Sequence, residues 1–86
     1  MRDLLSYLNI TRKGKFSKTN TYIVDIESSE EYGVLFSKLD TDDKFTEIES
    51  TDNENKLTVR YEYKQFIISI IYDINKEHYY LEIKEN

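Results

Sequence analysis

Residues 56–73, "KLTVRYEYKQFIISIIYD", decide the fold of this 86-residue chain. In the first half, four apolar side chains alternate with polar ones: Leu57, Val59, Tyr61 and Tyr63. This period-two pattern is typical of a half-buried strand. In the second half both sets of alternating positions are apolar, which is typical of a strand in the middle of a sheet. The short "YKQF" between the two halves predicts a hairpin turn.

Three further segments continue the period-two pattern on either side of this hairpin. "TYIVDIE" (21–27) is rich in β-branched and aromatic residues and predicts a strand. "KFTEIES" (44–50) is a weaker strand, because Phe45 and Ile48 are its only apolar residues. "YYLEIKE" (79–85) alternates again and follows a second turn, "INKEHY".

Two segments have helical spacing. Residues 2–10 place leucines and a tyrosine at i, i+3 and i+4, which predicts a short amphipathic helix. In "SSEEYGVLFSKL" (28–39), Ser28 stands three residues before Glu31, which is the spacing of a capping box. An apolar stripe follows and predicts a helix that ends near Leu39. The intervening 11–20 is a basic loop in which Gly14 interrupts regular structure.

These segments predict one α+β domain over residues 1–86 in the order α-β-α-β-β-β-β. An antiparallel sheet of about four to five strands would carry the second helix packed on one face. The opposite face includes Ile67, Ile71 and Tyr80 among charged residues. Either the first helix covers that face, or it is left as a contact patch.

The composition limits the class of protein. The chain has no cysteine, so neither disulfides nor thiolate metal sites are available. No apolar run approaches the roughly 20 residues that span a membrane, and the N-terminal apolar stretch is too short for a signal peptide, so we expect a cytoplasmic protein. Lys, Asn, Ile, Tyr and Phe make up 37 of the 86 residues, and alanine is absent. This usage indicates an A+T-rich genome: a low-GC bacterium, or a phage or plasmid in one.

Charge is strongly polarised along the chain. Residues 1–18 have a net charge of +4, whereas "LDTDDKFTEIESTDNEN" (39–55) has −6, within a total of −5. The acidic stretch is not an EF-hand loop, because Lys44 and Phe45 occupy two of the key positions in one register, and Lys56 and Leu57 occupy them in the other. We therefore expect no metal and no cofactor.

No catalytic motif stands out. The single histidine, His78, lies in a predicted turn without a cysteine or a recognisable serine nucleophile near it. We expect a protein that is not an enzyme. The acidic stretch is instead predicted to bind a partner, a host protein with a basic groove built for nucleic acid. In a regular strand Glu47 and Glu49 would point to the same side, with the other acids at the two strand ends. The predicted contact residues are Asp40, Asp42, Asp43, Phe45, Glu47, Glu49, Asp52 and Glu54.

Three alternatives stay open. An acidic edge strand also protects a sheet against aggregation without any partner. A homodimer or larger homo-oligomer could form through a strand edge or through the Ile67/Ile71/Tyr80 face. The basic loop, with Lys13, Lys15, Phe16 and Lys18, could contact nucleic acid, although the net charge of −5 disfavours direct binding.

In size, acidity and A+T-rich residue usage, the chain resembles small phage-encoded inhibitors of host defence, including anti-CRISPR proteins and other nucleic-acid mimics. Composition alone carries this resemblance, and it assigns no role to any residue. It implies a small, non-catalytic inhibitor that acts through protein–protein interaction in a bacterial cytoplasm.

Overall fold

The computed structural model describes residues 1–86 and contains two helices and six strands. In chain order they are α1 (Arg2–Tyr7), β1 (Lys15–Phe16), β2 (Tyr22–Ile26), α2 (Ser29–Thr41), β3 (Thr46–Asp52), β4 (Lys56–Tyr63), β5 (Phe66–Asp73) and β6 (His78–Glu85). The predicted α+β class is confirmed, and the predicted order needs one addition. Lys15 and Phe16 of the basic loop pair with Ile23 and Tyr22 as a short extra strand, β1.

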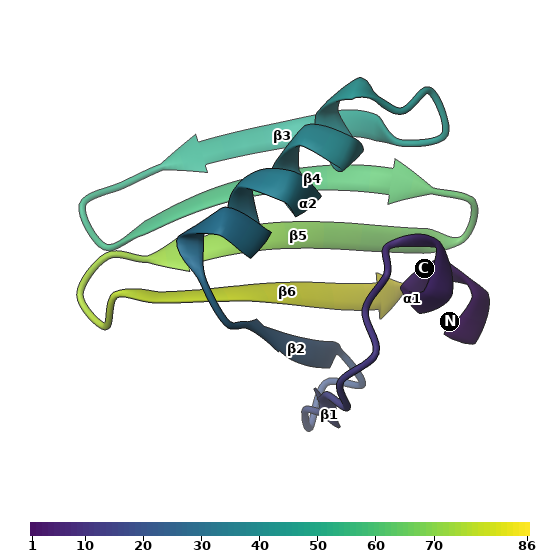
Figure 1. The fold of residues 1–86 in the computed structure, drawn as a ribbon, viewed down its shortest axis with the longest axis horizontal. Helices are drawn as coiled ribbons and strands as arrows, with labels where there is room; N and C mark the ends of the chain where they lie inside the picture. The colour runs from purple at the N-terminus through teal and green to yellow at the C-terminus, as the bar shows by residue number, and fades with distance from the viewer.

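All six strands form one sheet in the order β1-β2-β6-β5-β4-β3, and every neighbouring pair is antiparallel (Figure 1). The predicted four to five strands are therefore six. β5, which is apolar on both faces, lies inside the sheet between β4 and β6, as its pattern predicts. β2 pairs with the last strand, β6, so α2 must cross the sheet to reach β3 at the far edge (Figure 1).

One face of the sheet carries the hydrophobic core. The register places Tyr61, Ile68 and Ile83 next to one another on three adjacent strands, and none of them is exposed to solvent. Leu35 and Leu39 of α2 are buried in the same cluster. Each such side chain stabilises the fold by roughly 1.5–3 kcal/mol when fully buried. The stripe that predicts α2 is therefore the stripe that covers the sheet.

The start of α2 is capped as the sequence predicts. The backbone N–H of Glu31 donates a 3.1 Å hydrogen bond to Oγ of Ser28. The carboxylate of Glu31 accepts in return from the backbone N–H of Glu27 at 2.9 Å. The helix continues to Thr41, two residues beyond the predicted end, and stops where Asp42 adopts an extended conformation.

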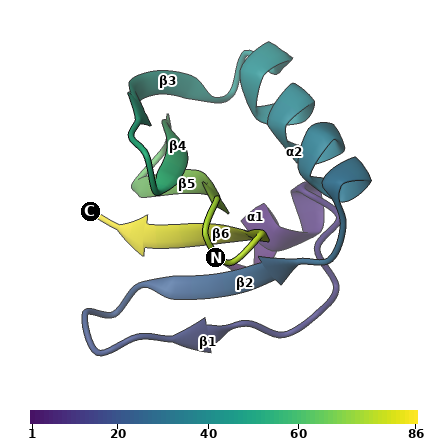
Figure 2. The ribbon, with the colours of Figure 1, turned by 90° about the vertical axis from the view of Figure 1, so that its left-hand side faces the viewer.

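The first helix packs on the same face as the second. Leu4 and Leu8 belong to the core cluster that contains Leu35 and Leu39 of α2, and Figure 2 shows both helices on one side of the curved sheet. The alternative in which α1 covers the opposite face is therefore excluded. That face has no covering element, and β1 and β3 form the two free edges of the sheet.

Candidate functional site

The acidic stretch forms one free edge of the sheet, β3. All seven residues of this strand are exposed, and the strand pairs with β4 alone. Seven extended residues span roughly 20 Å. The backbone groups on the outer side of β3 have no neighbouring strand, so this edge is open to a partner.

A β-bulge in β3 corrects the prediction that Glu47 and Glu49 point to the same side. Glu47 is opposite Tyr61, whose ring lies on the core face, whereas Glu49 is opposite Arg60 on the uncovered face. The intervening Ile48 has no partner of its own and is 49% exposed. One extra residue in a strand shifts its alternation, so the two glutamates face opposite sides.

The bulge also divides these two acids electrostatically. Glu49 forms a salt bridge with the guanidinium of Arg60, and both side chains are about half exposed. Exposed pairs of this kind stabilise a fold by about 0–1 kcal/mol, but they neutralise the charge that a partner would meet. Glu47 has no such pair. Its carboxylate contributes to the raised pKa of the buried Tyr61, which reaches about 12 chiefly because of desolvation and next because of Asp40.

Asp42 holds the chain where α2 ends. Its carboxylate accepts hydrogen bonds from the hydroxyl of Tyr7 and, at 2.9 Å, from the backbone N–H of Lys44. The Tyr7 hydrogen bond, followed by the Lys44 hydrogen bond, lowers the pKa of Asp42. This carboxylate is thus engaged in tying α1 to the turn before β3, unlike the neighbouring Asp43, which is exposed.

Phe45 does not lie on the surface as an aromatic anchor. Its side chain is 6% exposed, and its ring centroid lies 5.1 Å from that of Tyr63 and 6.0 Å from that of Tyr7. The ring belongs to the core, where it supports the turn into β3 from within. A partner could contact Phe45 only if this part of the core opened.

The remaining acids lie at the two ends of β3. Asp40 is on the last turn of α2, 3.5 Å from the hydroxyl of Tyr61, and Asp52 and Glu54 lie at the turn into β4. Oδ1 of Asn53 accepts from the backbone N–H groups of Asn55 and Lys56, which fixes this turn. We define the acidic edge as the exposed carboxylates that form no salt bridge: Asp40, Asp43, Glu47, Asp52 and Glu54.

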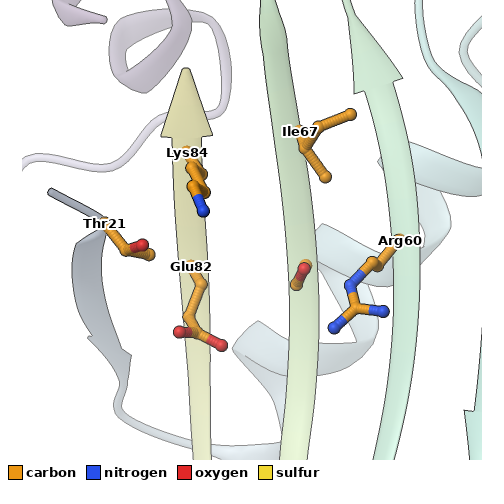
Figure 3. Close-up of a pocket in the computed structure, with 6 residues that line it drawn as sticks. Thr21, Arg60, Ile67, Glu82 and Lys84 are labelled. Carbon is orange, nitrogen blue, oxygen red and sulfur yellow. The ribbon is translucent and has the colours of Figure 1, made fainter. Parts of the chain in front are cut away.

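The uncovered sheet face is hollowed between β4, β5 and β6. A cavity of about 210 Å³ is lined by Thr21, Arg60, Ile67, Ser69, Glu82 and Lys84 (Figure 3). Arg60 on β4, which forms a salt bridge with Glu49, and Glu82 on β6 carry opposite charges and lie on either side of β5. The lining combines a guanidinium, a carboxylate, an ammonium group and two hydroxyls, so the hollow is a polar, mixed-charge surface.

His78 begins β6 and does not lie in the predicted turn. Its Nε2 is 3.0 Å from Oδ1 of Asp25 on β2.

The structure groups no set of three or more histidine, aspartate or glutamate side chains that could hold a metal ion. No helix is long and apolar enough to cross a membrane.

The contacts of Arg12 were not predicted from the sequence. Its guanidinium binds the carboxylates of Glu27 at 3.1 Å and Glu31 at 2.5 Å, and the carbonyl oxygen of Asp25 at 3.1 Å. Arg12 therefore clamps the chain before β1 to the junction of β2 and α2. Nothing in the local sequence separates Arg12 from the free lysines that follow it, because its acidic partners are 15 and 19 residues away.

No protein-family model, curated protein or solved structure matches this chain.

Proposed function

We propose that this chain is a small, non-catalytic binding protein whose acidic edge occupies a basic groove of a partner that handles nucleic acid. Given its A+T-rich composition, we place it in a phage or mobile element, where it would inhibit a host defence protein. One observation carries the proposal: five carboxylates without salt bridges lie on and around a fully exposed edge strand.

The edge offers charge in an arrangement that suits such a groove. Glu47 lies on β3, Asp52 ends the strand, and Asp40 and Asp43 flank its beginning. Carboxylates distributed along roughly 20 Å present a row of negative charges, as a short phosphate backbone does. Complementary charge of this kind accelerates association and excludes partners of like charge.

The bulge makes the test specific. Glu47→Lys/Asp52→Lys reverses two charges that no salt bridge neutralises. Glu49→Gln/Arg60→Gln removes the ion pair at the same strand without changing the net charge, so it is the matched control. Partners are captured on the immobilised wild-type chain from the lysate of a low-GC bacterium, identified, purified and titrated against each variant.

We expect Glu47→Lys/Asp52→Lys to weaken binding about tenfold or more and to flatten its salt dependence, whereas Glu49→Gln/Arg60→Gln changes binding less than about threefold. Duplex DNA should compete with the chain for the partner. If Glu47→Lys/Asp52→Lys binds as tightly as the wild type, or if DNA and the chain bind the partner together, the acidic edge is a solubilising edge and the proposal is wrong.

A further inference from the structure

The opposite edge of the sheet carries a basic hairpin with a fixed shape. β1 and β2 are joined by a turn in which the N–H of Ser17 donates to the carbonyl of Thr21 at 2.8 Å, and that of Asn20 donates to the carbonyl of Ser17 at 3.1 Å. Asn20 adopts a left-handed conformation with φ of 64°, which asparagine tolerates better than most residues. The residues on this hairpin are thus held in place and do not lie on a loose loop.

An aromatic ring is exposed on this edge. Phe16 is 62% exposed, although it belongs to a strand of the sheet. Its ring centroid lies 4.9 Å from that of Tyr22, which supports it from the side of the sheet. A large ring that is supported on one side and open to solvent on the other can stack on a nucleobase.

Three free cations lie on the same hairpin as this ring. Lys13, Lys15 and Lys18 are all exposed, and none of them forms a salt bridge. A hollow of about 240 Å³ lies between Lys13, Lys15 and Asp25. Oδ1 of Asp25 there lies 3.0 Å from Nε2 of His78, and Arg12 is paired with its own acidic partners, Glu27 and Glu31. The hairpin therefore presents lysines whose charge is available.

The net negative charge of the chain does not oppose binding at this edge as strongly as it would on a uniformly acidic surface. β1 and β3 lie at opposite ends of the six-strand order, with four strands between them (Figure 2). Charges further apart than about 10 Å are largely screened at an ionic strength of about 0.1 M. Fields from the acidic edge are consequently weak at Phe16.

We propose that the basic hairpin binds single-stranded nucleic acid, with Lys13, Lys15 and Lys18 on the phosphates and Phe16 against a base. Lys15 is opposite Ile23 and Phe16 opposite Tyr22, so the two side chains leave the strand on opposite faces. A flexible single strand that wraps the free edge reaches both, whereas the stacked bases of a duplex are closed to Phe16. This site is separate from the acidic edge.

A second copy of the chain is the competing occupant, because its acidic edge has the complementary charge. Strand pairing between copies would need a continuous ladder of backbone hydrogen bonds. β1 has only two residues, and the bulge at Ile48 interrupts β3. Both features oppose edge-to-edge pairing, which favours nucleic acid as the occupant.

The experiment titrates the whole chain into fluorescein-labelled 20-mers of thymidylate and uridylate and follows anisotropy at several salt concentrations. We expect saturable binding at low salt, with a slope of log K against log salt of about −2 for three phosphate contacts. Phe16→Ala should weaken binding by at least about fivefold through lost stacking. Lys15→Glu/Lys18→Glu should weaken binding and reduce the magnitude of this slope to less than about 1.

Two control variants change exposed apolar and basic residues elsewhere. Val34→Ala removes an apolar side chain that is 69% exposed on α2, and Lys76→Glu/Lys84→Glu reverses two other exposed lysines. Neither control should change binding by more than about twofold. Circular dichroism of each variant verifies the fold. A difference between the two 20-mers would tell RNA from DNA as the preferred ligand.

Three outcomes overturn the proposal: no binding at low salt, equal effects of the hairpin and control variants, or salt-sensitive self-association of the chain through the hairpin. Glu47→Lys/Asp52→Lys, which tests the acidic edge, should leave oligonucleotide affinity unchanged or slightly increased. Failure of one surface is therefore distinguishable from failure of the other.

Discussion

The two free edges of the sheet differ in how they are built. The β3 edge is seven residues long, acidic and interrupted by a bulge, whereas β1 is two residues long, basic and adjoins a tight turn. In each edge one charged residue is paired and its neighbours are free: Arg60 pairs Glu49 on one side, and Glu31 pairs Arg12 on the other. Charge counted along the sequence therefore overstates the unpaired charge that each edge presents.

Each edge is also tied to the core by a hydrogen bond from or to a tyrosine. The Tyr22 hydroxyl accepts from the backbone N–H of Gly14 at 2.7 Å, beside β1. The Tyr7 hydroxyl donates to Asp42, before β3. These hydrogen bonds hold both edges in place, and substitutions at them should affect the two edges differently.

The largest effect is expected from Gly14→Ala at the basic edge. A Cβ there would lie 2.3 Å from the carbonyl oxygen of Ile23 and 2.7 Å from Cγ2 of Val24, so β1 must move away from β2. We expect a loss of about 2 kcal/mol in the free energy of unfolding, typical of overpacking, measured by urea denaturation.

Gly33→Ala is the matched control for that change. Its Cβ would meet nothing within 4 Å on α2, so it should raise the free energy of unfolding by about 0.5–1 kcal/mol through helix propensity. Equal destabilisation by both variants would contradict the close approach of Gly14 to β2.

An intermediate effect is expected from acid, which should loosen both edges together. The Tyr7 hydrogen bond lowers the pKa of Asp42. Partial burial raises the pKa of Glu31, but hydrogen bonds from Arg12 and from the Glu27 N–H outweigh it and leave that pKa lowered. Carboxylates with lowered folded-state pKa values stabilise the fold above their unfolded pKa values of about 4, and this stabilisation is lost as pH falls through the folded values.

The urea midpoint should therefore fall between about pH 5 and pH 3, and Asp42→Asn and Glu31→Gln should each reduce this fall. Asp43→Asn removes an exposed carboxylate beside Asp42 and serves as the control, with little effect on the slope. A slope that is identical in all four proteins would show that these two anchors do not link the edges to pH.

The smallest effect on stability is expected from deletion of Ile48. Because Ile48 is the unpaired residue of the bulge, its removal leaves every other pair of β3 and β4 in register. We expect the urea midpoint to change little and self-association to increase, since a regular, bulge-free edge pairs more readily with another strand. Sedimentation velocity at micromolar concentration measures this.

Glu49→Gln is the contrasting control, because it removes the salt-bridge partner of Arg60 and keeps the bulge at Ile48. Association that is as weak in the Ile48 deletion as in the wild type would mean that charge alone protects this edge.

The local patterns of the sequence determined several elements. Period-two alternation over 56–73 and 79–85 predicted the β4–β5–β6 meander, and the double apolar pattern placed β5 inside the sheet. The spacing of Ser28 and Glu31 predicted the start of α2, where the hydrogen bond is found. Each of these patterns is set by residues a few positions apart, so the local sequence is sufficient to predict the element.

Tertiary structure alone decided the rest. The pairing of β2 with β6 and the packing of α1 on the same face as α2 join segments that are distant in the sequence. β1 is a local hairpin partner of β2, but its two residues are too few to show an alternating pattern. The bulge at Ile48 depends on the register against β4, and it separates Glu47 from Glu49. Which charges remain free depends on partners such as Arg60 and Glu31, 11 and 19 residues away from the groups they neutralise. Sequence determined how much charge each edge carries; contacts across the sheet decided how much of it remains unpaired at the surface.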